Sequence, residues 1–239
     1  MSVKSRIAEL NARLATKLTA RGVTASEDET TTALINKVDD IPEGGGIDWS
    51  QWTDWQYFSC NNNRNELVAK LKYSDTANGT NFSYMFYFCR ALTTIPEFDT
   101  SSGRDFSFMF YYCSALTTIP QLDTSSNTNF AYMFYTCSKL TTIPLLNMSS
   151  MSSTNWSSMF QNCSALENVT FEGTIPVRGN MNVFSSCSKL TVESLMSFIN
   201  ALTNMSSSST YTITIGSTNL AKLTEEQIQI ATDKRITLQ

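Results

Sequence analysis

The stretch "MFYYCSALTTIP", from Met109 to Pro120, is repeated almost letter for letter along this chain of 239 residues. The close copies "MFYFCRALTTIP" and "MFYTCSKLTTIP" begin at Met85 and Met133, and the weaker copies "MFQNCSALENVT" and "VFSSCSKLTVES" begin at Met159 and Val183. Successive copies start 24, 24, 26 and 24 residues apart. A fixed period of this size is typical of a solenoid, in which stacked units bury a continuous core that one unit cannot bury alone.

Each repeat divides into three parts with different backbone preferences. "ALTTIP" is short, β-branched and ended by proline, which predicts a brief parallel strand with Leu116 and Ile119 pointing inward. The turn-forming side chains that follow the strands fall in one column, formed by Asp99, Asp123 and Asn147. In "NFAYMFYTC" the apolar residues recur at i, i+3, i+4 and i+7, which predicts a short helix on the opposite side of the coil; they are Phe130, Met133, Phe134 and Cys137.

Every repeat also carries one cysteine on the predicted inner face. The five thiols form a structural column that we expect to be buried and reduced, with the cysteines acting as small apolar residues: Cys89, Cys113, Cys137, Cys163 and Cys187. A disulfide ladder is the alternative, which an odd number of thiols and a reducing compartment disfavour. The chain has no histidine and no Cys-x-x-Cys, so we expect neither a metal site nor any other cofactor.

The full pattern resembles a known class of repeats. Met-Phe-x-x-Cys-x-x-Leu-x-x-Ile-Pro followed by "DTSS" is similar to the BspA-like leucine-rich repeats of bacterial and phage surface proteins, over about residues 81–190. The resemblance implies an α/β repeat fold, a leucine-rich-repeat solenoid of short parallel strands and short helices. The fourth and fifth copies depart from the pattern, because "ENVTFEGTIP" and "TVESLMSFIN" replace the strand sequence.

The first 43 residues differ in character from the repeats. They carry 13 charged side chains, against 11 in the 110 residues from 81 to 190. Their apolar positions alternate in steps of four and three, which predicts an amphipathic helix with Val3, Ile7, Leu10 and Leu14 on its docking face. A second helix would end near Pro42, and the resulting helical hairpin resembles the N-terminal segments of phage tail and other virion proteins. We therefore expect residues 1–43 to dock on a particle or to form homo-oligomers.

Two flanking segments should close the ends of the repeats. Residues 44–80 begin with a "GGG" hinge and continue with Trp49, Trp52 and Trp55, which predicts an N-terminal cap or, alternatively, a ligand-stacking platform. Residues 191–239 predict a C-terminal cap. It would contain a helix capped by Thr191, a strand in "TYTITIG", a helix starting at Thr224 with a Thr-x-x-Gln box, and a last short strand.

Composition narrows the function classes. Charged residues make up only 16% of the chain, the net charge is −4, and no basic run offers a nucleic-acid footprint. The absence of histidine removes the usual general base, so we do not expect an enzyme, and scattered carboxylates disfavour a glycan-cleaving one in particular. No apolar run is long enough to insert into a membrane. "MSVKSRIAEL" has no apolar signal region, so we expect synthesis in a bacterial cytoplasm without ordinary secretion, followed by assembly into a virion.

These observations favour a phage virion protein of the tail, tail fibre or baseplate that attaches to the host. Its helical N-terminus would bind other virion proteins, and its repeats would bind a host-surface glycan or protein. The alternatives are a structural capsid-decoration or head-fibre protein and, less favoured, a bacterial surface adhesin. Candidate binding residues form two columns, which might instead serve only packing and strand formation: Tyr87, Tyr111 and Tyr135, and Thr94, Thr118 and Thr142.

Overall fold

The computed structural model describes residues 11–12, 15–16, 76–151, 156, 158–204 and 210–239. The chain divides into two units, and residues 76–239 belong to the larger one. In the smaller unit, the four described residues are helical, and the Thr16 hydroxyl donates to the Ala12 carbonyl at 2.9 Å. The predicted docking residues Val3, Ile7, Leu10 and Leu14 lie outside the described residues, as do the three tryptophans from 49 to 55. The hairpin and the aromatic cap therefore stay predictions.

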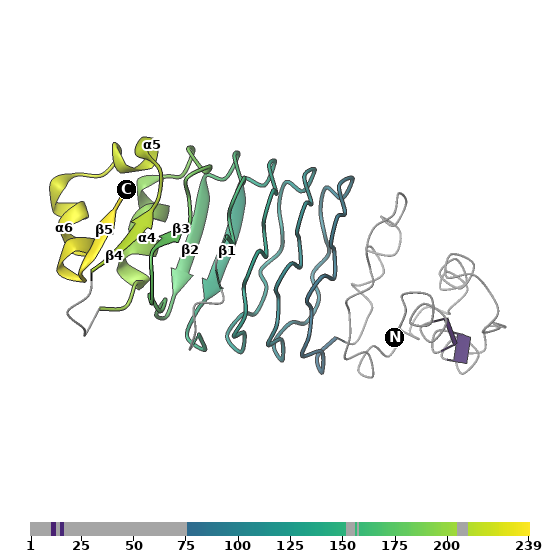
Figure 1. The fold of residues 1–239 in the computed structure, drawn as a ribbon. Helices are drawn as coiled ribbons and strands as arrows, with labels where there is room; N and C mark the ends of the chain where they lie inside the picture. The colour runs from purple at the N-terminus through teal and green to yellow at the C-terminus, as the bar shows by residue number, and fades with distance from the viewer. Residues whose placement is uncertain (1–10, 13–14, 17–75, 152–155, 157, 205–209) are drawn as a thin grey trace. The chain divides into compact units, whose positions relative to one another are not determined.

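Successive repeats of the larger unit lie side by side and are joined by parallel backbone hydrogen bonds (Figure 1). The Phe82 amide donates to the Asp105 carbonyl at 2.8 Å, and the Thr117 amide donates to the Thr93 carbonyl at 3.0 Å. Parallel bridges also join Asp105 to its counterparts in the flanking repeats. Residues of the first two repeats thus lie beside the residues 24 positions further along, and the step from the third repeat to the fourth is 26 positions, so the sequence columns are columns in space.

The "TTIP" side of the repeats becomes a parallel strand ladder only where the pairing is continuous. Strand β1 (Thr142–Asn147) pairs in parallel with β2 (Asn168–Glu172), although "ENVTFEG" departs from the repeat pattern. The register shifts between Ile143 and Leu146, around Pro144, which has no amide hydrogen to donate. In the earlier repeats the ladder is reduced to isolated hydrogen bonds and one bridge, between Thr118 and Thr142.

The helix predicted within each repeat is wrong, although its burial pattern is correct. Phe130, Met133, Phe134 and Cys137 are all buried, but the backbone forms a series of turns rather than a helix. Amides of alternate residues donate three residues back, as from Met133 to the Phe130 carbonyl, and the amides between them donate to the next repeat. The turn segment of each of the first four repeats contains two residues with left-handed backbone, four positions apart. This spacing of four resembles the period of a helix.

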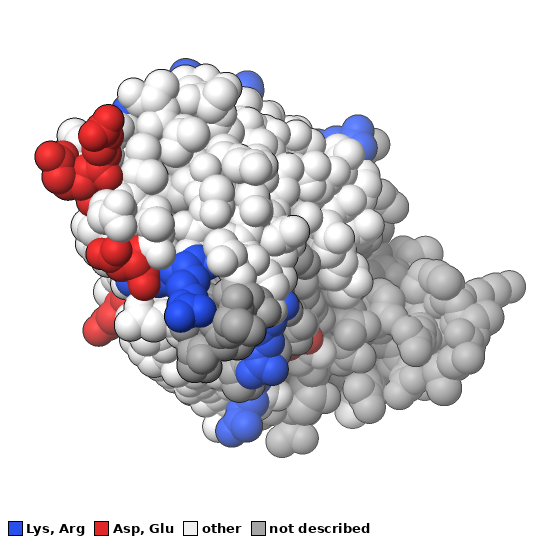
Figure 2. All heavy atoms as spheres, turned by 60° about the vertical axis from the view of Figure 1, so that its left-hand side comes forward, with Lys and Arg blue, Asp and Glu red and all other residues white. Residues whose placement is uncertain are grey.

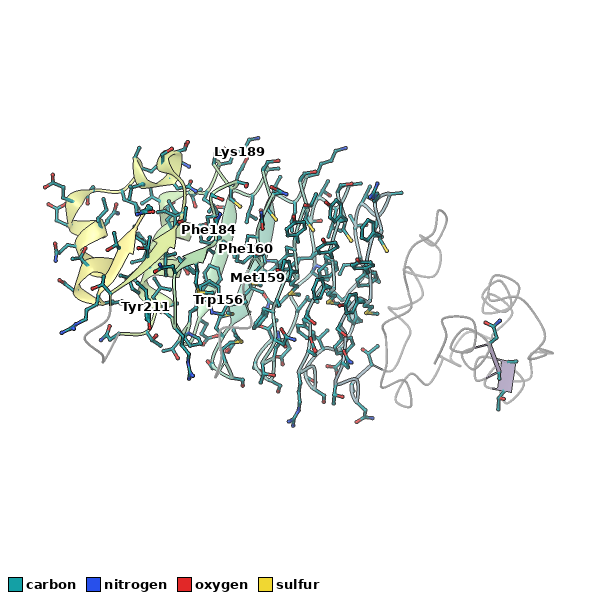
Figure 3. The ribbon with its side chains drawn as sticks, viewed as in Figure 1. Trp156, Met159, Phe160, Phe184, Lys189 and Tyr211 are labelled. Atoms are coloured by element: carbon teal, nitrogen blue, oxygen red, sulfur yellow. The ribbon has the colours of Figure 1, made fainter. Side chains whose placement is uncertain are left out.

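The core consists of columns of like side chains. The Phe that follows each Met stacks on its counterpart in the next repeat, with ring centroids 5.2 to 6.0 Å apart; the column is Phe86, Phe110, Phe134, Phe160 and Phe184. Figure 3 labels the last two rings beside Met159 and Trp156, within the same interior. The corners are fixed between repeats by the buried threonine of "DTSS", since Thr100 donates its hydroxyl to the Asp123 carbonyl at 3.0 Å.

The C-terminal segment carries the regular helices, which confirms their prediction there. Helix α4 (Val192–Ala201) is capped by Thr191, and two of its serine hydroxyls accept the amides of Val169 and Phe171 at the edge of β2. Beyond it, β3 (Met181–Asn182), β4 (Tyr211–Thr214) and β5 (Ile236–Leu238) form a parallel sheet in that order. Helix α5 (Ser217–Leu220) and helix α6 (Glu225–Asp233) connect β4 to β5, and α6 begins with the predicted capping box at Thr224.

The described part of the chain is therefore a mixed structure of short strands and short helices with parallel pairing. None of the helices found there has the length and apolar character needed to span a lipid bilayer.

Candidate functional site

Eight aromatic side chains lie half-buried beside one another on the turn side of the first three repeats. They form three columns, which we call the aromatic band: Tyr84, Phe108 and Tyr132; Tyr87, Tyr111 and Tyr135; and Phe88 with Tyr112. The predicted column that starts at Tyr87 runs along the middle of the band, since its rings contact both other columns. Three repeats thus bring side chains from distant parts of the sequence onto one surface.

The rings of each column are stacked almost parallel. Tyr84 and Phe108 have centroids 4.7 Å apart and planes 6° apart, and Tyr111 and Tyr135 are separated by 4.8 Å and 13°. Ring faces inside a column are therefore covered by neighbouring rings, and the band presents ring edges and phenol hydroxyls outward. The cause is the spacing between repeats, which is close to the separation of two stacked aromatic rings.

The residues of two of the three columns have a left-handed backbone conformation that residues other than glycine rarely adopt. Tyr84, Phe108 and Tyr132 have φ values of 61°, 58° and 56°, and Phe88 and Tyr112 both have 60°. Glycine and asparagine are the usual occupants of this left-handed region, and other residues cost roughly 1–2 kcal/mol there. The chain nevertheless places large aromatic residues at these positions. The same positions in the fourth repeat are occupied by Ser158 and Asn162, with φ values of 53° and 64°.

The band is uncharged and its hydroxyls are available. Burial, reinforced by the neighbouring Tyr135 phenol, raises the pKa of Tyr111, and burial likewise raises the pKa of Tyr84, so both phenols stay protonated at neutral pH. Within the described residues, no side-chain or backbone group forms a hydrogen bond with a hydroxyl of the band. The cation nearest the rings is Arg90, whose guanidinium lies 5.0 Å from the Phe88 centroid.

The threonine column lies on the strand side, separate from the aromatic band. Thr94, Thr118 and Thr142 are all exposed, as predicted for a strand face. The column beside it is structural, because the hydroxyls of Thr117 and Thr141 donate to the carbonyls one repeat earlier, at 3.1 and 3.4 Å. The exposed threonines thus offer aligned hydroxyls on a surface that has no aromatic component.

The cysteine column is buried as predicted, but its chemistry differs from the prediction in two ways. Cys89, the first cysteine of the column, is disulfide-bonded, so the expectation of five reduced cysteines is wrong. The four later cysteines are free thiols. The free thiols are also hydrogen-bond donors, not only apolar spacers. Each donates to the Phe carbonyl one repeat earlier, as from Cys137 Sγ to Phe110 O at 3.1 Å.

The two residue groups with metal or acid-base potential have structural roles. Burial raises the pKa of the free thiols, to about 12 for Cys187, so they are protonated and unreactive at neutral pH. Asp99 and Asp123 each accept the amide and hydroxyl of the serine two residues later, and these bonds lower the pKa of Asp99. Among the described residues, no cluster of three or more acidic, thiol or imidazole groups is arranged to hold a metal ion.

Sequence reasoning located one of the three columns of the band. The other two were missed, although the i, i+3 and i+4 spacing of Tyr84, Tyr87 and Phe88 would place all three on one face of a helix. A signal for them exists in the sequence: aromatic residues occupy the position before each Met and the position before two of the cysteines in repeats one to three, and nowhere in repeat four.

Comparison with known proteins identifies a family for the repeats. The family described as "Mycoplasma protein of unknown function, DUF285" matches residues 56–172 and, in an overlapping second match, residues 80–198. Together the two matches span more than half of the chain, including the aromatic band and the cysteine column. No curated protein and no solved structure is similar enough to count as a match.

Proposed function

Because this chain belongs to the DUF285 family, we propose that it is an attachment protein that binds a ligand on a cell surface through the aromatic band. BspA-like surface repeat proteins carry the domain that defines this family. The observation that carries the proposal is the placement of half-exposed aromatic residues on left-handed backbone, where smaller residues would fit better.

This placement of aromatic residues costs free energy. An exposed aromatic patch promotes association, and a left-handed aromatic residue destabilises the fold relative to glycine. The fourth repeat shows that the coil can be built with Ser158 and Asn162 at these positions. Stacking between rings offsets part of the cost. The rest of this free-energy cost is explained if the rings bind a partner, because strained residues concentrate at functional sites.

We also propose a fold for the repeats and a particle on which the protein is mounted. We take the stacked repeats to be a solenoid of the leucine-rich-repeat type, as the resemblance over residues 81–190 implies. Residues 1–43 would dock this module on a phage tail or baseplate. The protein would bind its ligand through the same aromatic band whether it is mounted on a virion or on a bacterial cell.

The attachment function is tested by binding of the purified full-length chain to intact bacterial cells. The three tyrosines Tyr87, Tyr111 and Tyr135 are replaced together by serine, and Thr94, Thr118 and Thr142 together by alanine. We expect the tyrosine variant to lose at least tenfold in cell binding and the threonine variant to bind like the parent. Thermal unfolding and far-ultraviolet circular dichroism verify that both variants are folded.

Unchanged cell binding by a folded tyrosine variant would refute the role of the band. If the threonine variant alone loses binding, the strand side is the binding surface instead. A chain that begins at Ile47 tests the docking step separately: it should keep its cell binding but no longer associate with virions or with itself.

A further inference from the structure

The aromatic band ends abruptly between the third and fourth repeats. Tyr132 is followed in its column by Ser158, and Tyr135 is followed by Gln161. Backbone hydrogen bonds still join the two repeats at this step, since Phe134 donates to the Met159 carbonyl at 3.0 Å and Thr136 donates to the Gln161 carbonyl at 2.8 Å. The two repeats are therefore paired here although the ring is missing. At this end, Tyr132 lacks the neighbouring ring that covers the corresponding face of Phe108 and Tyr84 inside the column.

The vacated position is bordered by small and neutral polar groups. Ser158 has the same left-handed backbone as Tyr132, so its short side chain projects where the next ring of the column would lie. Asn162 is exposed and donates from Nδ2 to the Thr136 hydroxyl at 3.2 Å, which leaves its carbonyl oxygen available. Gln161 is half-buried, and its side-chain amide forms no hydrogen bond with a described residue. None of the residues around this position is charged.

We propose that this end of the band binds a neutral saccharide, with one pyranose ring stacked on the Tyr132 face above Ser158 and hydrogen-bonded by the amides of Gln161 and Asn162. The inference rests on the proposed attachment function and names its ligand class. A pyranose ring has an apolar face of C–H groups and a rim of hydroxyls, so it matches an aromatic face bordered by amides. Its thickness fits the spacing of 4.9 Å that separates Phe108 from Tyr132 in the same column.

Charge and hydrogen bonding favour this class over acidic ligands. An anionic glycan would require cations beside the aromatic face, and the residues that border Tyr132 provide none. Most of the surface drawn in Figure 2 is uncharged, and most of its acidic side chains gather at the left edge. The rings of Tyr132, Tyr135 and Tyr111 continue the site along the band with centroids 5.8 and 4.8 Å apart, so their phenol hydroxyls extend it for a neutral polysaccharide.

The experiment fills the vacated position instead of removing the site. Ser158→Tyr adds the missing fourth ring to the column and should cover the Tyr132 face, while Tyr132→Ser removes that face. Thr170→Tyr is the matched control, because it adds a tyrosine at an exposed position on strand β2, on the strand side of the repeats. Full-length parent and variants are applied to an array of neutral and acidic oligosaccharides, and the best neutral compound is titrated by calorimetry.

We expect the parent and Thr170→Tyr to bind at least one neutral oligosaccharide, and both variants at the end of the band to bind it at least tenfold more weakly. Ser158→Tyr should remain folded by circular dichroism and thermal unfolding, which separates a blocked site from a damaged fold. Binding to acidic glycans alone, binding to none, or unchanged binding by a folded Ser158→Tyr variant would each overturn the proposal. If the protein attaches to cells but fails in this way, the attachment function stands with a protein as its ligand; if it does not attach at all, the attachment function itself fails.

Discussion

The free cysteines connect neighbouring repeats through their thiol groups. The Phe110 carbonyl accepts the amide of Cys113 in its own repeat and the thiol of Cys137 in the next one. A weak sulfur donor satisfies the second lone pair of a buried carbonyl without introducing the stronger polarity of a hydroxyl. This explains why the position holds cysteine, when alanine would lose the bond and serine would bury a more polar group.

Alkaline pH should unfold the repeats because these thiols must lose their protons. The folded-state pKa values are raised above the value of about 8.5 for an unfolded thiol, so their stabilising contribution is complete below pH 8.5 and falls as the pH rises toward about 12. Four free thiols together remove about 5 kcal/mol per pH unit within this window. We expect cooperative unfolding between about pH 9.5 and 11.

The measurement follows modification of the thiols by a cysteine-specific reagent and circular dichroism across one pH series. Both signals should change together, because a thiolate forms only in the unfolded chain. The raised pKa values of Tyr84 and Tyr111 act in the same direction. Thiolate formation below pH 10 with native dichroism would show that the column is accessible to water.

At the scale of the element, the turn segment of each repeat depends on residues that tolerate left-handed backbone. Thr136 occupies such a position with φ of 60°, although a β-branched residue is poorly suited to it. The corresponding residue of the fourth repeat is Asn162, whose type is favoured there. Replacing Thr136 by asparagine should therefore stabilise the protein by about 1 kcal/mol.

Chemical denaturation of the parent and of Thr136→Asn measures this gain. Thr142→Asn is the control, because Thr142 is exposed but lies at the start of strand β1, where asparagine is disfavoured. A stability gain in the control, or a loss in Thr136→Asn, would argue against backbone strain as the cause.

The C-terminal end of helix α4 is closed by a lysine from another element. Lys234 Nζ donates to the carbonyls of Ile199, Asn200 and Leu202, at 3.0, 2.6 and 2.7 Å, and so supplies donors to carbonyls at the C-terminal end of the helix. Partial burial lowers the pKa of Lys234, whereas the three carbonyls favour its charged form. The geometry shows three short bonds to one ammonium group, and these identify the charged form as the one that closes the helix.

Lys234→Met keeps the apolar stem of the side chain and removes the three donors. The free energy of unfolding should fall by about 1.5–3 kcal/mol, as for the loss of hydrogen bonds from a charged group. Equilibrium denaturation compares it with Lys189→Met, in which an exposed lysine is replaced. Equal effects of the two substitutions would mean that the carbonyl contacts contribute nothing to stability.

At the scale of the whole stack, each repeat is stabilised mainly by its two neighbours. Phe134 lies between Phe110 and Phe160, with centroid distances of 5.4 and 6.0 Å, and is fully buried. Phe134→Ala should cost roughly 3–5 kcal/mol, because it opens a cavity in the middle of the ring column. The loss should also weaken the coupling between the halves of the stack.

Calorimetry should show this as a lower melting temperature and a broader transition than in the parent. Leu145→Ala provides the control, since Leu145 in the same repeat is 38% exposed and should change stability by less than about 0.5 kcal/mol. A cost below about 1.5 kcal/mol for Phe134→Ala would mean that the ring column does not carry the core.

The sequence by itself determined the period, the columns and the C-terminal helices. A repeat of 24 residues forces equivalent positions into the same environment, so the burial of Met133, Phe134 and Cys137 followed from their recurrence. The C-terminal helices followed from local signals at Thr191 and Thr224, because a capping side chain and its amide lie within three residues of each other. These features depend on contacts that are close in sequence or repeated along it.

Only the tertiary structure decided how the turn segments are built and what the aromatic residues present. A helix and a series of turns with a left-handed residue at every fourth position bury the same side chains, so the apolar pattern cannot distinguish them. The choice is made by amides such as that of Phe86, which donates to Met109 in the next repeat instead of to its own segment. That same spacing between repeats stacks the rings of Tyr111 and Tyr135 and covers the faces that lie between them. Tyr132 has no following ring, because Ser158 takes the next position of its column. Distances between repeats are set by the packing of the whole core, and no single repeat encodes them.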